Sequence, residues 1–328
     1  VVGTRSAVFA PVQNLGLIVM DEEQESTYKS ESTPRYHARD IAKFRVNYNR
    51  AYCLLCSATP SVESYYMAQS GKYRYHALHH RYGDAVVPTV QLVDMNNEDL
   101  YRGKPMISMA LARAVSENIR VGRQSILLLN RRGYHTYAVC KDCKTVAACP
   151  NCSISMTYHA ANNRLMCHYC GHSEPAYVRC KACGGELTFS GGGTQKAEDQ
   201  LREAFPEARI LRVDTDTTAN KYALEKKLNA FANGEYDIMI GTQMVAKGLD
   251  FENVTLVGVL SADQSLYSDD YRSNERTFDL LTQVVGRAGR GRYRGTALIQ
   301  THVPENPYLH LAAAQDYESF FETEIRFR

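Results

Sequence analysis

Eight of the ten cysteines fall into four C-x2-C pairs within one short stretch, and this stretch constrains the fold more than any other feature. Pairs with this spacing are typical of metal ligands, and we expect them to bind metal rather than form disulfides. Four thiolates on one ion with no further ligand are the set that holds structural zinc. The sequence therefore predicts two structural Zn2+ ions, held by the pairs Cys140/Cys143, Cys149/Cys152, Cys167/Cys170 and Cys180/Cys183.

The spacing also indicates how the pairs combine. The gap between Cys152 and Cys167 is close to that of a zinc ribbon, so we expect the two inner pairs to share one ion. The outer pairs, Cys140/Cys143 and Cys180/Cys183, then share a second. This nested arrangement brings the ends of the insertion together and lets it sit inside a larger domain. Sequential pairing of neighbouring pairs is the alternative, although the short gap from Cys143 to Cys149 makes it tighter.

Strand-like and helix-like segments alternate on both sides of the cysteine stretch. Short unbroken apolar runs are typical of parallel strands that are buried on both faces. A chain of 328 residues suits two domains. The pattern predicts an α/β protein with two doubly wound parallel sheets. The expected strands are 15–20, 51–57, 90–94, 125–130, 208–214, 237–241, 254–260 and 295–300, and the expected helices include 106–119, 197–205 and 222–232.

Charge and hydropathy exclude some classes of partner. The net charge is only +2, so any surface that binds nucleic acid must be a local one. The sequence contains no apolar run long enough to span a bilayer, and we expect no membrane partner.

Acidic and hydroxyl side chains follow the first two expected strands. Asp21 and Glu22 come directly after the run 15–20, at the edge where α/β sheets bind ligands. Asp21 suits holding Mg2+ through water, and Glu22 suits deprotonating an attacking water. Ser57 and Thr59 follow the second run and suit a hydrogen-bond relay between sites. The alternatives are an acidic surface loop and a helix cap.

Two further segments pair basic residues with aromatic residues or glycines. Residues 25–40 interleave tyrosines with lysine and arginines, a pattern that suits stacking on single-stranded nucleic acid, although a solvated loop has the same composition. Residues 283–292 place Arg287 and Arg290 three apart among glycines. Guanidinium groups one helical turn apart suit gripping a nucleotide triphosphate. The alternative for this second segment is a basic, glycine-rich surface turn.

Taken in order, these motifs resemble those of the superfamily 2 helicases, and more narrowly those of the PriA family of bacterial replication-restart helicases. The cysteine stretch is the narrowing feature, because few helicases carry one at this place. The matching segments are Gly3–Ala7 (motif Ib), Asp21–Gln24 (Walker B), Tyr36–Asp40 (end of an aromatic-rich loop), Ser57–Thr59 (motif III), Asn130–Tyr134 (motif IV), Gly241–Gly248 (motif V) and Gln283–Arg290 (motif VI).

The resemblance implies ATP as substrate with Mg2+, and a role for each motif. Asp21 and Glu22 would be catalytic, and Arg287 and Arg290 would touch the γ-phosphate from the second lobe. Nucleotide binding and coupling would fall to Gln24, Ser57, Thr59, Gly248, Asp250 and Gln283. DNA contacts would fall to Thr4, Arg5, Tyr28, Lys29, Tyr36, Arg39, Arg131, Thr242 and Gln243.

The same resemblance implies a function and partners. It implies an ATP-dependent 3'→5' DNA helicase that acts at stalled forks, restarts replication and loads the primosome. The implied partners are single-stranded and forked DNA, single-stranded DNA-binding protein, and the primosome proteins PriB and DnaT. The implied location is the bacterial cytoplasm, at the nucleoid. The alternative function is a non-enzymatic, zinc-containing docking module on an ATPase scaffold.

The resemblance also sets the expected boundaries. They are the C-terminal part of a first RecA-like lobe (1–80), a linker (81–105), the first part of a second RecA-like lobe (106–139), the zinc insertion (140–186), the remainder of that lobe (187–303) and the start of a C-terminal domain (304–328).

The sequence departs from the family pattern at three places. Gln24 stands where the family usually has His, and Gln195 stands where it usually has Glu. No G-x-x-x-x-G-K-[ST] loop occurs in the sequence. We expect that loop and the DNA-binding N-terminal domains to lie upstream of Val1, and we expect this chain alone to turn over ATP negligibly.

Overall fold

The computed structural model divides the chain into two compact units. It describes residues 1–78, 88–129, 136–143, 145–152, 155–159, 162–167, 170–190, 194–214, 221–242, 245, 251–267, 270–289 and 293–328. Unit 1 consists of Val1–His79 with Thr323–Arg328, and unit 2 consists of His80–Glu322. Each unit is described by itself.

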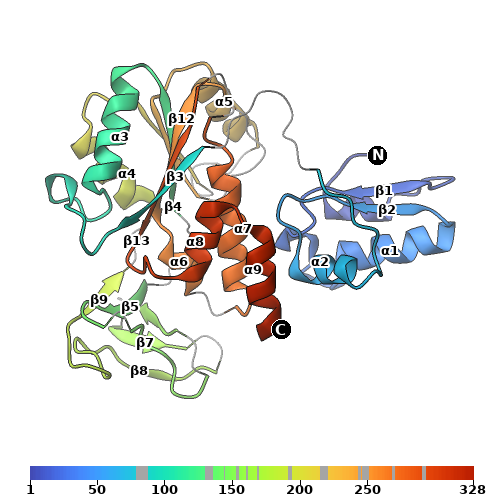
Figure 1. The fold of residues 1–328 in the computed structure, drawn as a ribbon, viewed down its shortest axis with the longest axis horizontal. Helices are drawn as coiled ribbons and strands as arrows, with labels where there is room; N and C mark the ends of the chain where they lie inside the picture. The colour runs from blue at the N-terminus through green and yellow to red at the C-terminus, as the bar shows by residue number, and fades with distance from the viewer. Residues whose placement is uncertain are drawn as a thin grey trace. The chain divides into compact units, whose positions relative to one another are not determined.

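Unit 1 is built on two parallel strands, β1 (Leu17–Met20) and β2 (Tyr52–Leu55), with the helices α1 (Ala38–Asn49) and α2 (Val62–Gln69) (Figure 1). Short 3-10 helices span Arg5–Phe9 and Ser26–Tyr28. The imidazole of His37 caps α1 by accepting from the backbone N–H of Arg39, and the Ser61 hydroxyl caps α2 by accepting from that of Ser64. Because β1 and β2 are parallel, the residues that follow them leave the sheet at the same edge.

Unit 2 is built on six parallel strands in the order β10-β11-β4-β12-β13-β3. All six residues of the central strand β4, QSILLL, are buried, which explains the apolar run of its last four residues. In chain order the strands are β3 (Thr89–Asp94), β4 (Gln124–Leu129), β10 (Ile210–Val213), β11 (Ile238–Gly241), β12 (Val254–Ser261) and β13 (Thr296–Thr301).

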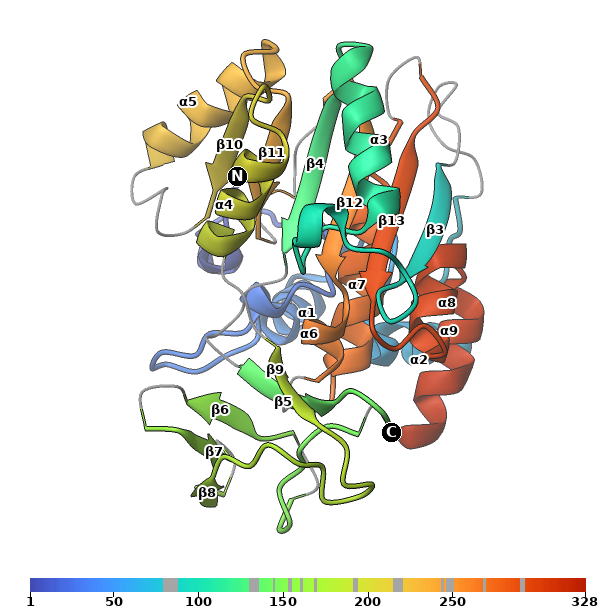
Figure 2. The ribbon, with the colours of Figure 1, turned by 90° about the vertical axis from the view of Figure 1, so that its left-hand side faces the viewer.

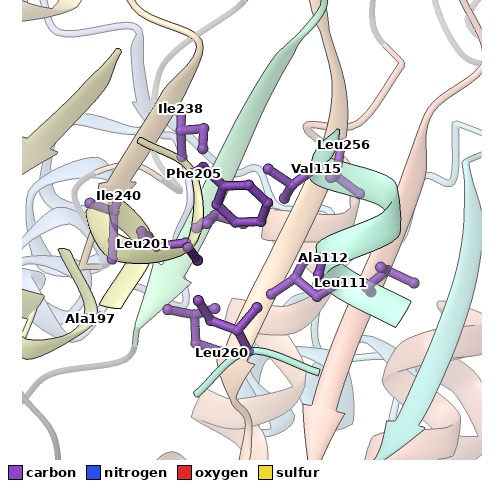
Figure 3. Packing of buried hydrophobic residues seen from close by; sticks show 14 of the residues in the cluster. Leu111, Ala112, Val115, Ala197, Leu201, Phe205, Ile238, Ile240, Leu256 and Leu260 are labelled. Carbon is purple, nitrogen blue, oxygen red and sulfur yellow. The ribbon is translucent and has the colours of Figure 1, made fainter. Parts of the chain in front are cut away.

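Helices cover both faces of this sheet. Helices α3 (Met109–Arg120) and α4 (Thr194–Ala204) lie on one face, and α7 (Ser273–Val285) and α8 (Pro307–Ala314) lie on the other (Figure 2). On the first face, leucine, valine and phenylalanine side chains from α3 and from the end of α4 pack against the sheet (Figure 3). The remaining helices are α5 (Lys221–Ala232), α6 (Asp263–Leu266) and α9 (Tyr317–Glu324), with 3-10 turns at Tyr101–Gly103 and Ile325–Phe327.

The cysteine stretch folds as a separate antiparallel sheet in the order β8-β7-β6-β5-β9. Its core is small, with Ala138, Met156 and Leu165 packed beside Cys149 and Cys167. The strands are β5 (Thr136–Cys140), β6 (Thr157–His159), β7 (Arg164–Met166), β8 (Ser173–Pro175) and β9 (Leu187–Ser190).

The structure confirms an α/β fold with parallel sheets and a Cys-rich insertion, but it moves three of the expected boundaries. The linker expected over 81–105 contains β3, which pairs with β13 at the edge of the six-stranded sheet. The insertion expected over 140–186 extends to 136–190, because β5 and β9 pair with each other. Residues 307–314, expected to begin another domain, form α8 and pack against α7 and β3.

Within the described ranges, no helix combines the length and the apolar character needed to cross a membrane.

Gln300 is fully buried at the centre of unit 2 and bonds three backbone groups. Its amide oxygen accepts from Ser108 N–H at 3.0 Å, and its amide nitrogen donates to the carbonyls of Met106 at 2.9 Å and Leu260 at 3.0 Å. We expect Gln300→Leu to lower the free energy of unfolding by about 3 kcal/mol or more, because buried backbone groups lose their partners. Urea denaturation of the chain measures this. The control is Gln91→Leu on the exposed side of β3, and an equal effect of the two substitutions would contradict the account.

Candidate nucleotide site and zinc centres

The residues that follow β1 form a strained acidic turn, which we call the acidic box (Asp21–Gln24). Glu22 has a φ of 48°, in the left-handed region that non-glycine residues rarely occupy. Its backbone N–H donates to the Asp21 carboxylate at 3.1 Å, and the next N–H, that of Glu23, donates to the carbonyl of Cys56 at 3.1 Å. Strain of this kind is concentrated at functional sites and persists only where neighbouring contacts enforce it.

The side chain of Gln24 connects the acidic box to the residues that follow β2. Its amide nitrogen donates to the Glu22 carboxylate at 2.8 Å, and its amide oxygen accepts from the Ser57 hydroxyl at 2.6 Å. The Ser57 oxygen in turn accepts from the backbone N–H of Thr59 at 2.9 Å. The structure thus brings four of the predicted site residues into one hydrogen-bonded chain, Glu22–Gln24–Ser57–Thr59.

Thr59 ends this chain with a hydroxyl that has no partner in the described part of the structure. The residue is 1% exposed. Buried hydroxyls are nearly always bonded to protein or to ordered water.

The aromatic segment contacts the acidic box from the other side. The Tyr28 hydroxyl donates to the backbone carbonyl of Asp21 at 2.7 Å. Burial, with the Asp21 charge next, raises the pKa of Tyr28, so this hydroxyl keeps its proton. Arg5 donates to the carbonyls of Thr27 and Lys29 at 3.2 Å and 3.0 Å, and Tyr36 packs edge-on against Phe9 at 4.9 Å between ring centroids. Of the predicted DNA-binding residues of unit 1, Tyr28 is therefore held against the predicted catalytic residue Asp21.

Arg39 differs from the rest of the predicted DNA-binding set. Its guanidinium forms a 2.9 Å ion pair with Glu23, and its side chain is only 14% exposed. The side chains of Thr4 and Lys29, in contrast, are exposed. A DNA contact by Arg39 stays a prediction, but the structure gives its charge a partner inside the unit.

In unit 2, the segment around motif VI packs onto the start of β12. Arg287 is the second residue after α7, which carries Gln283. Gly289 has a φ of 71°, and its N–H donates to the carbonyl of Val254 at 3.2 Å. A Cβ on Gly289 would lie 2.4 Å from the backbone nitrogen of Gly295, so only glycine fits this close approach.

The other predicted site residues of unit 2 are only partly described. Thr242 is buried just after β11. Five predicted site residues, Arg131, Gln243, Gly248, Asp250 and Arg290, lie outside the described residues.

The eight paired cysteines form two groups of four, combined in the nested way that the spacing predicts. The ligand atoms within each group lie within 4.8 Å of one another. The Sγ···Sγ distance is 3.5 Å between Cys140 and Cys183, and it is 3.6 Å both between Cys143 and Cys180 and between Cys149 and Cys170. Tetrahedral Zn–S bonds of about 2.3 Å place sulfurs about 3.8 Å apart, so both groups fit a structural zinc ion.

Local hydrogen bonds favour the thiolate form that zinc needs at two of the cysteines, Cys143 and Cys170. The Thr145 side chain, followed by its backbone, lowers the pKa of Cys143 to about 6, and the backbone N–H of His172 does the same for Cys170. Hydrogen bonding to Cys170 raises the pKa of Cys152 to about 12. Four thiols this close do not all ionise unless a cation offsets their repulsion, which a divalent metal does.

Comparisons with known proteins agree with this arrangement. Residues 149–175 match the PriA DNA helicase Cys-rich region domain, and residues 187–292 match the helicase conserved C-terminal domain. The replication restart protein PriA of Bacillus subtilis (strain 168) is 50% identical over 329 residues, which cover 100% of this chain. The chain belongs to the PriA family.

The chain spans less than half the length of these PriA relatives: it covers 41% of the Bacillus protein. PriA of Chlamydia trachomatis serovar D is 44% identical, with 99% of this chain and 44% of that protein covered. Among solved structures, RecG bound to a three-way DNA junction has a TM-score of 0.48 at 13% identity, covering 96% of this chain and 30% of that one. This last likeness is too distant to bear on function.

The sequence pattern does not single out three polar residues in and beside the acidic box, namely Glu23, Ser61 and Ser64. Glu23 is 2% exposed, and it bonds Ser61 and Ser64 at the start of α2. In the sequence Glu23 directly follows another glutamate, and no pattern distinguishes the two. In the structure, the strained backbone at Glu22 points the two side chains in different directions. The serines carry the signal of a helix cap and nothing that indicates the acidic box.

Removing one thiolate should empty one zinc centre and leave the other. We expect the parent PriA-family chain to bind two zinc ions and Cys149→Ser to bind about one, because a serine hydroxyl is a poor zinc ligand. Metal analysis of the purified chain measures this. Cys53→Ser, which changes a cysteine outside both groups, should keep both ions. A parent without zinc, or a Cys149→Ser variant with two ions, would contradict the assignment.

Proposed function

We propose that the full-length gene product is an ATP-dependent DNA helicase. It translocates 3'→5' on single-stranded DNA at stalled forks, restarts replication and loads the primosome. The observation that carries this proposal is the hydrogen-bonded acidic box at the carboxyl edge of β1, in a chain of the PriA family.

In this proposal the two acidic side chains divide the work of hydrolysis. Asp21 is an exposed carboxylate, and oxygen ligands of this kind suit Mg2+, which when bound offsets the charge of the phosphates. Asp21 holds that ion through water. Glu22 orients the attacking water and accepts its proton. The strained backbone and the Gln24 amide fix the direction of the Glu22 carboxylate.

Residues of unit 2 complete the reaction. Arg287 and Arg290 stabilise the charge that develops on the γ-phosphate. Gln283, Gly248 and Asp250 support nucleotide binding and coupling. Ser57 and Thr59 pass the change at the nucleotide to the DNA-contacting parts, and the unpaired hydroxyl of Thr59 supports that role.

Nucleic-acid contacts are shared by both units. Tyr28 and Tyr36 offer aromatic faces to single-stranded DNA, and exposed Lys29 offers a charge to its phosphates. Thr4, Arg5, Arg131, Thr242 and Gln243 complete the proposed contacts. The zinc insertion separates strands or docks partners, for which we propose single-stranded DNA-binding protein, PriB and DnaT.

Two substitutions test the enzymatic proposal in the full-length gene product. We expect Glu22→Gln to lower DNA-stimulated ATP turnover by about 100-fold or more, because the water loses its base. Arg290→Ala should lower it by about 1,000-fold or more. Both variants should still bind zinc. A coupled phosphate-release assay measures turnover, and strand displacement from forks with a 3' or a 5' single-stranded arm measures direction.

A different result would support the alternative, non-enzymatic function. Unchanged turnover in Arg290→Ala with weakened partner binding would establish a docking module instead. Because the sequence holds no G-x-x-x-x-G-K-[ST] loop, residues 1–328 alone serve as the negative control and should turn over ATP negligibly.

Gln24 offers a test of coupling through pH. An amide does not titrate, so the link from Glu22 to Ser57 keeps its donor and acceptor at every pH. Histidine has an ordinary pKa of about 6.5 and donates from both nitrogens once protonated. We therefore expect the turnover of Gln24→His, divided by that of the parent, to change between about pH 5.5 and 7.5. Above that range the neutral imidazole can donate to Glu22 and accept from Ser57, as the Gln24 amide does in the parent. A pH profile of DNA-stimulated turnover measures the ratio, and a flat ratio would show that this link does not limit the rate.

A further inference from the structure

Glu23 is a buried carboxylate to which the proposed reaction gives no task. Its side chain is 1% exposed and is surrounded by donors. Arg39 donates from Nη1 at 2.9 Å, the backbone N–H of Ser61 at 2.6 Å, and the hydroxyls of Ser64 and Ser61 at 3.0 Å and 3.2 Å. A carboxylate is buried at a large cost unless it is paired and bonded, and here it is both.

These bonds join three elements at one point. Ser61 is the N-cap of α2 and Ser64 lies in its first turn, Arg39 belongs to the first turn of α1, and Glu23 directly follows the strained residue of the acidic box. Nη1 of Arg39 also lies 2.7 Å from each of the two serine hydroxyls, so its two N–H groups are shared among three acceptors. Glu23 is therefore fixed to both helices of unit 1.

The backbone on both sides of Glu22 is fixed as well. The Glu23 N–H donates to Cys56 at 3.1 Å, and the Glu25 N–H donates to the carbonyl of Glu22 at 2.9 Å. A left-handed residue between free neighbours would relax to a commoner conformation. The Glu23 side chain is an anchor directly beside Glu22, because hydrogen bonds to a carboxylate are stronger than neutral ones.

We propose that Glu23 is a positioning residue, clamped by Ser61, Ser64 and Arg39, that holds Glu22 in its strained conformation and so aims the Glu22 carboxylate at the attacking water. The proposal rests on the proposed function. It gives Arg39 a role inside unit 1 instead of on DNA.

The first test is Glu23→Gln in the full-length gene product. An amide keeps the size of the side chain but removes the charge and turns a donor toward Arg39 and the two serines. We expect kcat for DNA-stimulated ATP turnover to fall about 10-fold, while KM for ATP changes less than about two-fold, because small errors in aim affect the chemical step. The assay runs well below the thermal midpoint of the variant, so that all of the protein is folded.

Asp40→Asn is the matched control. It neutralises an exposed carboxylate of α1 next to Arg39. The Asp40 carboxylate forms only a long ion pair with Lys43, at 3.9 Å. Its kcat should equal that of the parent. A Glu23→Gln variant that melts at a lower temperature but keeps the parent's kcat would show a purely structural role and overturn the proposal.

Arg39→Gln separates the two possible roles of the arginine. If Arg39 acts through Glu23, kcat falls while the affinity for single-stranded DNA and its dependence on salt stay unchanged. If Arg39 contacts a DNA phosphate, the affinity falls and the slope of log affinity against log salt loses about 0.7, the value for one single-strand phosphate contact. The second result would contradict the proposal that Arg39 acts by holding Glu23.

Amide hydrogen exchange tests the positioning independently of activity. Glu23→Gln should speed exchange at Glu23 and Glu25, whose N–H groups hold the turn, and Asp40→Asn should not. If the parent itself shows no ATP turnover, the proposed function fails, and this measurement alone decides the present proposal. Unchanged exchange at these two amides would overturn it.

Discussion

The parallel pairing of β1 with β2 is the interaction on which unit 1 depends. Its register runs from Leu17 opposite Tyr52 to Met20 opposite Leu55, so both strands end at the same level. The acidic box and the Ser57 segment therefore leave the sheet side by side, within reach of one glutamine side chain. A shift of one residue would turn every side chain of a strand to the other face and separate the two segments.

The zinc insertion has too small a core to be stable by packing alone and is held together in a different way. Its strands are three to five residues long, and its core contains cysteines among few apolar side chains. A core of this size does not hold a chain together unaided, and metal binding supplies the missing free energy. The nested order also joins the two ends of the insertion, since Cys140 and Cys183 bind at one centre. The six-stranded sheet can therefore carry the insertion without losing its own strand order.

Features of the fold that depend on one type of residue could be predicted from the sequence. The buried strand β4 ends in an apolar run of four residues, and the cysteine spacing favours nested over sequential pairing. Contacts between residues distant in the sequence could not be predicted. The strand expected at 90–94 lies within the expected linker, whereas β3 pairs with β13 at the edge of the six-stranded sheet. Arg39 stands among aromatic residues and resembles a DNA contact, and only the fold places Glu23 beside it.

The bonds that hold Glu23 to Arg39, Ser61 and Ser64 also set the charge that the acidic box presents. Asp21, Glu22 and Glu23 place three carboxylates on consecutive residues, and their mutual repulsion opposes the turn. Arg39 offsets one of them, which leaves a net charge of 1 − 3 = −2, carried by Asp21 and Glu22. Two negative charges at a sheet edge complement a hydrated divalent cation. Burying Glu23 with its own cation thus lets three adjacent acidic residues serve two separate ends, one inside the unit and one at its surface.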